Sequence, residues 1–146
     1  MLKVKITKIS LFQKILPYCS GSLAIGDLSE DRTKSFDTFT SSVVVIDTDK
    51  GVSGVGESCP WVQDNLNELE VYNNLASCLL GEDPLKIKQI IKNMDMAVQG
   101  HTFAKSALDM ACWDIKGKNS RVPLYELLGG KLTNGAPLYR CVMKIA

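Results

Sequence analysis

Apolar and polar residues alternate at the start of the chain, which predicts a β-strand. The alternating series then shifts its phase by one position, as shown by Leu2, Val4, Ile6, Ile9 and Leu11. A shift of this kind is typical of a β-bulge, placed here near Thr7 or Lys8. From residue 13 to residue 37 the periodicity is lost, and we expect a long loop that is functional or mobile. The alternative is a disordered surface excursion.

A second and a third strand are predicted to follow as a hairpin. Residues 39–48 are rich in β-branched side chains, and residues 52–57 form a further short extended run. The connection Asp49-Lys50-Gly51 suits a three-residue turn with Gly51 in the left-handed conformation. The first part of the chain is therefore predicted to be three antiparallel strands.

After residue 60 the apolar period changes from two to about 3.6, which predicts helices. The first helix is expected over residues 64–80, with Gly81 at its end. The second is expected to have Asp83 as its cap and Pro84 at its first helical position. Its apolar stripe consists of Ile87, Ile90, Ile91, Met94 and Val98.

A third helix is predicted after His101, with Thr102 as its cap. Its apolar face consists of Ala104, Ala107, Leu108, Ala111 and Ile115, and so many alanines predict a close helix contact. A short helical segment over residues 123–128 and a strand over residues 136–142 complete the chain. Strands followed by helices are typical of the α+β class, here a three-stranded antiparallel meander followed by a helical bundle.

The composition is that of one soluble globular domain, with 45% hydrophobic and 23% charged residues in 146. Its 17 basic and 16 acidic residues are scattered, so we expect neither a nucleic-acid partner nor a membrane partner. The longest strongly apolar run, residues 43–46, is too short to span a membrane, and the N-terminus does not resemble a signal peptide. We therefore expect a cytoplasmic protein whose five cysteines, which form no C-x-x-C pair, are reduced.

Several stretches resemble the N-terminal region of the mandelate racemase/muconate lactonizing enzyme family of the enolase superfamily. Residues 104–130 combine an alanine-spaced helix with the pair Trp113-Asp114, followed by Gly-Lys, Pro-Leu and Leu-Leu-Gly-Gly. The hairpin of residues 49–60 and the helix boundary at residues 81–84 are similar to the same family. Residues 56–60, taken with residues 94–105, are similar to members that racemise, epimerise or dehydrate proline derivatives.

This resemblance implies two domains: an enolase-type N-terminal capping domain in residues 1–130, and the start of a truncated (β/α)-barrel in residues 131–146. In the family, two segments of the capping domain close over the mouth of the barrel, and they correspond to residues 16–26 and 57–63. We predict Tyr18 and Trp61 as the substrate-binding side chains, because an aromatic face can pack against a cation or an apolar ring. The alternative for each is a surface aromatic that fills a small hydrophobic gap.

The resemblance also implies a reaction in which a proton α to a carboxylate is removed and a divalent metal, usually magnesium, stabilises the enediolate. A barrel that carries the ligands and bases usually needs about 250 residues, so we expect no catalytic residue, metal ligand or cofactor in this chain. Asp109 and Asp114 point about 140° apart on a helix, which favours structural roles over a metal pair. His101 lies where a helix dipole opposes its protonation and Lys144 stands alone, so neither is predicted to be a base.

The leading hypothesis is the capping and substrate-specificity domain of a metal-dependent racemase, epimerase or dehydratase, inactive without a barrel. Its partner would be a small-molecule carboxylate, bound only when the barrel is present. The alternatives are a non-catalytic binding or oligomerisation module with the same fold, and a small enzyme of unrelated chemistry, which the empty site inventory disfavours. Self-association is also expected, because the absent barrel would leave four apolar side chains uncovered, namely Leu124, Leu127, Leu138 and Val142.

Overall fold

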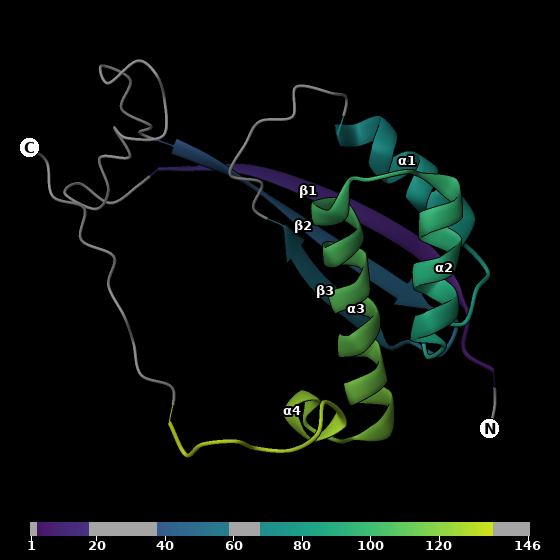
Figure 1. Ribbon diagram of the computed structural model, residues 1–146. Helices are drawn as coiled ribbons and strands as arrows, with labels where there is room; N and C mark the ends of the chain where they lie inside the picture. The colour runs from purple at the N-terminus through teal and green to yellow at the C-terminus, as the bar shows by residue number, and fades with distance from the viewer. Residues whose placement is uncertain (1–2, 18–37, 59–67, 136–146) are drawn as a thin grey trace, which may run out of the picture.

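The computed structural model describes residues 3–17, 38–58 and 68–135, and Figure 1 shows a sheet with helices packed on one face. The elements are β1 (Ile6–Pro17), β2 (Thr38–Thr48), β3 (Ser53–Ser58), α1 (Glu68–Leu79), α2 (Ile87–Ala97), α3 (Thr102–Ser120) and α4 (Leu124–Leu127). The strands are antiparallel in the order β1-β2-β3. The predicted α+β meander followed by helices is confirmed, and the described residues form no closed barrel.

The first strand confirms the predicted bulge, because its register with β2 shifts between Ile6 and Lys8. The expectation of a loop from residue 13 is wrong for residues 13–17, which continue β1 and pair with residues 38–42 of β2. Two adjacent polar residues, Gln13 and Lys14, interrupt the alternation in the sequence, but the cross-strand hydrogen bonding continues past them. The remainder of that segment, residues 18–37, lies outside the described residues.

The start of α2 differs from the prediction, because the helix begins at Ile87 rather than at Pro84. The Asp83 side chain accepts a hydrogen bond from the Leu85 amide at 3.0 Å, and the Asp83 carbonyl accepts one from the Lys86 amide at 3.1 Å. Asp83 therefore closes a separate turn that precedes the helix, instead of capping the helix itself.

The apolar face predicted for α3 is confirmed, since Ala104, Ala107, Leu108, Ala111 and Ile115 are all buried. Thr102 is the first helical residue rather than the cap; the residue at the cap position is His101, which makes no side-chain capping bond. The predicted final helical segment is confirmed as α4, and the predicted strand over residues 136–142 lies outside the described residues. No helix in the described part of the chain is long and apolar enough to cross a membrane.

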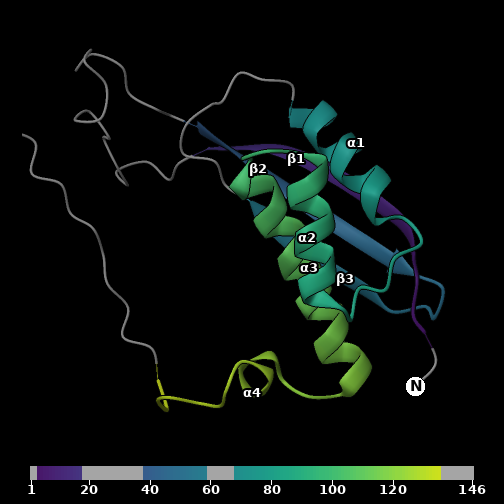
Figure 2. The same ribbon diagram turned by 45° about the vertical axis from the view of Figure 1, so that its right-hand side comes forward.

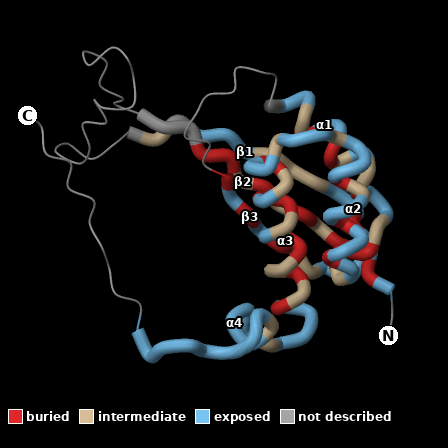
Figure 3. The backbone as a smooth tube through the Cα atoms, in the orientation of Figure 1, coloured by how far each residue is buried: buried red, intermediate tan, exposed pale blue. Residues whose placement is uncertain are grey.

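The core lies between the helices and the inner face of the sheet, where Figure 3 shows the buried backbone positions gathered. Two of the five cysteines, Cys78 and Cys112, are in the described residues, and both are free thiols. Burial, together with the nearby Asp109 carboxylate, raises the pKa of the Cys112 thiol to about 12. Cys112 is therefore a small, unreactive apolar side chain of the core, and the thiol is free, as the absence of a C-x-x-C pair predicted.

Helix α3 lies directly on β3, with backbone against backbone. A Cβ atom added to Gly56 would overlap the carbonyl oxygen of Ala107, and one added to Gly54 would overlap that of Ala111. At these glycines the strand meets the backbone of the helix, and the Ile115 side chain also lies close to Gly54. The close contact predicted from the alanine content of α3 is therefore confirmed, with glycine as its counterpart on the strand.

One carboxylate on α3 is only partly satisfied. Oδ1 of Asp109 is buried and has no hydrogen-bond partner, and desolvation raises the pKa of this carboxyl above its ordinary value of 3.8. The side chain lines a shallow depression of about 220 Å³ between α2 and α3, beside Ile91 and Met94. An ionised group in such surroundings costs stability, because it has lost water without gaining a donor.

Replacing Gly56 by alanine is expected to destabilise the fold by about 2–3 kcal/mol, because the new methyl group would push α3 away from β3. The matched control is Gly135→Ala, since nothing lies within 4 Å of a Cβ at Gly135 and its φ is outside the left-handed region. Urea unfolding of both variants measures the difference. Equal midpoints for the two variants would show that the helix–strand contact is not close.

Replacing Asp109 by asparagine is expected to stabilise the fold at pH 7 by up to about 1 kcal/mol, and by less as the pH falls. Because the pKa of Asp109 is raised in the folded state, the folded chain binds this proton at a higher pH than the unfolded chain, so acidification removes the penalty. Urea unfolding at pH 7 and pH 4 tests the gain in stability and its decrease on acidification. The control Asp95→Asn removes the exposed partner of Lys105 and should give no gain in stability. A loss of stability for Asp109→Asn at pH 7 would reveal a stabilising partner.

Candidate functional site

The sheet has a loop end, at which β1 stops, β2 starts and β3 stops. Pro17 pairs there with Thr38, and Ser58 pairs with Ser42. Residues 18–37 connect β1 to β2 and residues 59–67 follow β3, so both segments are attached to the sheet at this end. These are the segments in which the sequence predicts most of the substrate contacts.

Hydroxyl groups replace apolar side chains at the loop end. The inner face of β2 carries Ile46 and Val44 along most of its length but Ser42 at the loop end. Ser41, Ser42 and Ser58 are all buried, with 4% exposure or less. Short hydroxyl side chains fit between strands and still donate and accept hydrogen bonds. They can therefore bond to neighbouring groups at the end of the sheet.

These hydroxyls bond to groups on other elements. The Ser58 hydroxyl and the Tyr72 hydroxyl of α1 are 3.0 Å apart and both are buried. The Ser41 hydroxyl donates to Oε1 of Glu57 at 2.5 Å, and Nε2 of Gln13 lies 3.5 Å from the Ser42 hydroxyl. We refer to Ser41, Ser42, Ser58 and Tyr72 as the hydroxyl cluster. It joins β2 to β3 through Ser41 and β3 to α1 through Ser58, where residues 59–67 begin.

The two predicted substrate-binding residues, Tyr18 and Trp61, lie outside the described residues, so their role stays a prediction. Of the two predicted substrate-facing segments, the structure describes residues 16–17 and 57–58. The hydroxyl cluster was not predicted from the sequence. Its signal there is the appearance of serine at the inner positions of β2 and β3, Ser42 and Ser58. Tyr72 is too far along the chain to be matched with Ser58 by spacing.

Asp114 has the structural role that was predicted for it. Its Oδ2 accepts hydrogen bonds from the Val55 amide at 2.9 Å and from Nζ of Lys118 at 2.7 Å. His101 lies at the start of α3 with a left-handed φ of 50°, and Lys144 lies outside the described residues. Within residues 3–17, 38–58 and 68–135, no three histidine, cysteine or acidic side chains are grouped so as to hold a metal ion.

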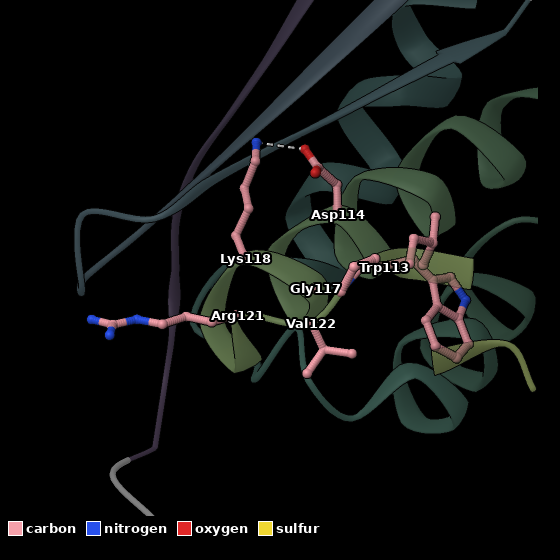
Figure 4. Close-up of a pocket in the computed structure, with 8 residues that line it drawn as sticks. Trp113, Asp114, Gly117, Lys118, Arg121 and Val122 are labelled. Atoms are coloured by element: carbon pink, nitrogen blue, oxygen red, sulfur yellow. Dashed lines mark hydrogen bonds and ion pairs between the residues drawn. The ribbon is translucent and has the colours of Figure 1, made fainter. Parts of the chain in front are cut away.

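The larger surface depression, about 380 Å³, lies at the other end of α3. Lys118, one of its lining residues, also donates to the Ser53 carbonyl at the start of β3, far from the loop end. Figure 4 shows Lys118 and Asp114 pointing toward one another, while Arg121 points away from them. The polar groups of this depression thus hold α3 to β3, and the candidate site remains the loop end of the sheet.

Comparison with known proteins agrees with this architecture. The chain matches the family described as mandelate racemase/muconate lactonizing enzyme, N-terminal domain, over residues 32–129. It is 39% identical to a cis-3-hydroxy-L-proline dehydratase from Roseibium aggregatum, across 98% of this chain and 39% of that protein. Its fold is similar to a mandelate racemase/muconate lactonizing enzyme from Roseovarius nubinhibens, with a TM-score of 0.81 and 39% identity over 94% of this chain and 37% of the other.

A dipeptide epimerase from Enterococcus faecalis, solved with Mg and the dipeptide L-Leu-L-Tyr, is also similar, with a TM-score of 0.74 and 27% identity over 86% of this chain and 35% of the other. The chain spans less than two fifths of the length of these relatives. The match covers the helices, β2 and β3 in the family's order. The chain therefore belongs to the mandelate racemase/muconate lactonizing enzyme family of the enolase superfamily, as its N-terminal domain.

Proposed function

We propose that this chain is the capping and substrate-specificity domain of a metal-dependent racemase, epimerase or dehydratase that acts on a carboxylate with an α-proton. Residues 1–130 would form the capping domain and residues 131–146 the start of a barrel. The observation that carries the proposal is the loop end of the sheet, where both predicted substrate-facing segments are attached and where the hydroxyl cluster joins the neighbouring elements. The metal ligands and bases are assigned to the barrel.

The hydroxyl cluster would hold the segments at a fixed distance from the barrel. Buried hydrogen bonds such as that between Ser58 and Tyr72 define one arrangement of the strand end and α1. A segment anchored in this way can close over a bound carboxylate and exclude water. Excluding water strengthens the electrostatic interactions on which proton removal from a weak carbon acid depends.

We propose a proline derivative as the substrate class. The support is the 39% identity to a protein named cis-3-hydroxy-L-proline dehydratase, over nearly the whole of this chain. A proline ring has an apolar face next to a cationic secondary amine, and both suit an aromatic side chain. Tyr18 and Trp61, one in each segment, are the aromatic residues that we assign to these contacts.

The chain by itself is expected to show no turnover of cis-3-hydroxy-L-proline with magnesium supplied, and a fusion to the barrel of a family member is expected to be active. The reason is that the proposed bases and metal ligands belong to the barrel. The barrel expressed alone is the control. Turnover that follows the purified 146-residue chain through every step would contradict the proposal, and an inactive but folded fusion would favour a non-catalytic binding module.

In the active fusion, Trp61→Ala and Tyr18→Ala are each expected to raise KM about tenfold, through lost aromatic contact with the substrate, with kcat changed much less. The matched control is Tyr125→Ala, which removes an aromatic side chain that is 48% exposed on α4. Steady-state kinetics separates the two parameters. If the Tyr125 variant raises KM as much as the other two, these aromatics have no specific role.

A further inference from the structure

Residues 131–135, which follow α4, stand apart from the packed part of the domain. All of them are exposed, and Leu132 is 97% exposed. Figures 1 and 2 both show this yellow end of the described chain running away from α4, with no helix or strand beside it. Packing against the domain therefore places little restriction on the backbone of this segment.

Hydrogen bonding restricts the segment just as little. The Thr133 hydroxyl donates to the Gly135 carbonyl at 2.5 Å, and residues 131–135 make no other hydrogen bond with described residues. The Gly135 amide thus donates to no described acceptor. Nothing lies within 4 Å of a Cβ atom placed on Gly135. The amide nitrogen of Gly135 is therefore unhindered on the side of the residue that precedes it.

The residue that precedes Gly135 is Asn134. An Asn-Gly pair is common in tight hairpin turns, but residues 131–135 have no cross-strand partner among the described residues. An asparagine side chain places its amide carbon where the next backbone nitrogen can close a five-membered ring. Glycine allows this approach most readily, because it has no side chain and the widest choice of φ and ψ.

We propose that Asn134 and Gly135 form a self-modification site, at which the asparagine deamidates through a cyclic imide. The Gly135 amide gives up its proton, its nitrogen bonds to Cγ of Asn134, and the bond from Cγ to Nδ2 breaks, so that the side-chain nitrogen leaves as ammonia. Water then adds to one of the two ring carbonyl groups and opens the ring. One opening gives aspartate, and the other gives isoaspartate, in which the main chain runs through Cγ. Water is the only co-reactant.

Other asparagines of the described chain are protected by their helices. Asn119 precedes Ser120 at the end of α3, and Asn73 precedes Asn74 within α1. In a helix the backbone is held in one conformation by hydrogen bonds between successive turns, so the next amide nitrogen cannot reach the side-chain carbon. The modification is therefore expected at Asn134 before Asn119 and Asn73.

The modified residue would lie in the link between two domains, a consequence that rests on the proposed function. Residues 131–146 are proposed there as the start of the barrel. Deamidation adds a negative charge to the link, and isoaspartate also lengthens its main chain by one carbon atom. Aged molecules would then differ from new ones at the connection between the capping domain and the barrel.

Peptide mapping by mass spectrometry of the full 146-residue chain, incubated for several days at pH 8, tests the proposal. Asn134 is expected to convert at least about tenfold faster than Asn119 or Asn73. The expected products are ammonia and isoaspartate, the latter detected with an isoaspartyl methyltransferase. Conversion of Asn134 no faster than that of Asn119 would overturn the proposal. The measurement needs no turnover, so its outcome is independent of the proposed function.

Two variants identify the reacting groups. Gly135→Ala is expected to slow the conversion by about tenfold, because the methyl group hinders the amide nitrogen while meeting no other atom within 4 Å. Asn134→Gln should abolish conversion at this position, since the longer side chain would have to close a six-membered ring. Equal rates for Gly135→Ala and the unchanged chain would contradict the mechanism.

Unfolding the chain in guanidinium chloride separates this site from the helical asparagines. The rates at Asn119 and Asn73 are expected to rise, because unfolding frees the amides that follow them. The rate at Asn134 is expected to stay nearly the same, because its neighbouring amide is already free in the folded chain. A large acceleration at Asn134 would mean that the fold protects it, and would overturn the proposal.

Discussion

The fold depends on the backbone contact between α3 and β3. Gly54 and Gly56 face the carbonyl groups of Ala111 and Ala107 with no side chain between them, so the helix sits as near to the sheet as the two backbones allow. This distance determines how deeply the apolar stripe of α3 reaches the core. A larger residue at either glycine would meet a backbone carbonyl of α3, and at Gly54 also the Ile115 side chain, so the contact cannot adapt unless the helix moves.

The same contact protects the edge of the sheet. β3 pairs with β2 on one side, which leaves its other edge with unpaired backbone groups. Asp114 accepts the Val55 amide and Lys118 donates to the Ser53 carbonyl, both at 2.9 Å. Two side chains of α3 therefore take the places of a further strand, which blocks the pairing with other chains that an exposed edge invites. The acidic residue of the aromatic–aspartate pair therefore has a structural role, since it holds α3 against the edge of β3.

The loop end of the sheet combines a rigid base with long connecting segments. Within the hydroxyl cluster, the buried contact between Ser58 and Tyr72 holds the end of β3 against α1, and the bond from Ser41 to Glu57 joins β2 to β3. Binding residues carried by loops on a rigid scaffold are the usual arrangement in proteins whose specificity varies while their fold does not. A family whose relatives include a hydroxyproline dehydratase and a dipeptide epimerase has this requirement.

The sequence by itself determined the class of fold, the hairpin turn, the apolar stripe of α3 and the family, because each depends on local spacing or on a contiguous motif. Gly51, predicted to be left-handed in that turn, has a φ of 72°. The tertiary structure alone decided which residues meet across elements, such as Ser58 with Tyr72, and where α2 and α3 begin. It also placed Arg121 in a left-handed conformation at the end of α3, a position where glycine is the residue that local rules favour. The periodicity of apolar residues predicts the face of an element on which a side chain lies. The residue that lies opposite depends on strand register and helix packing, which are properties of the whole fold.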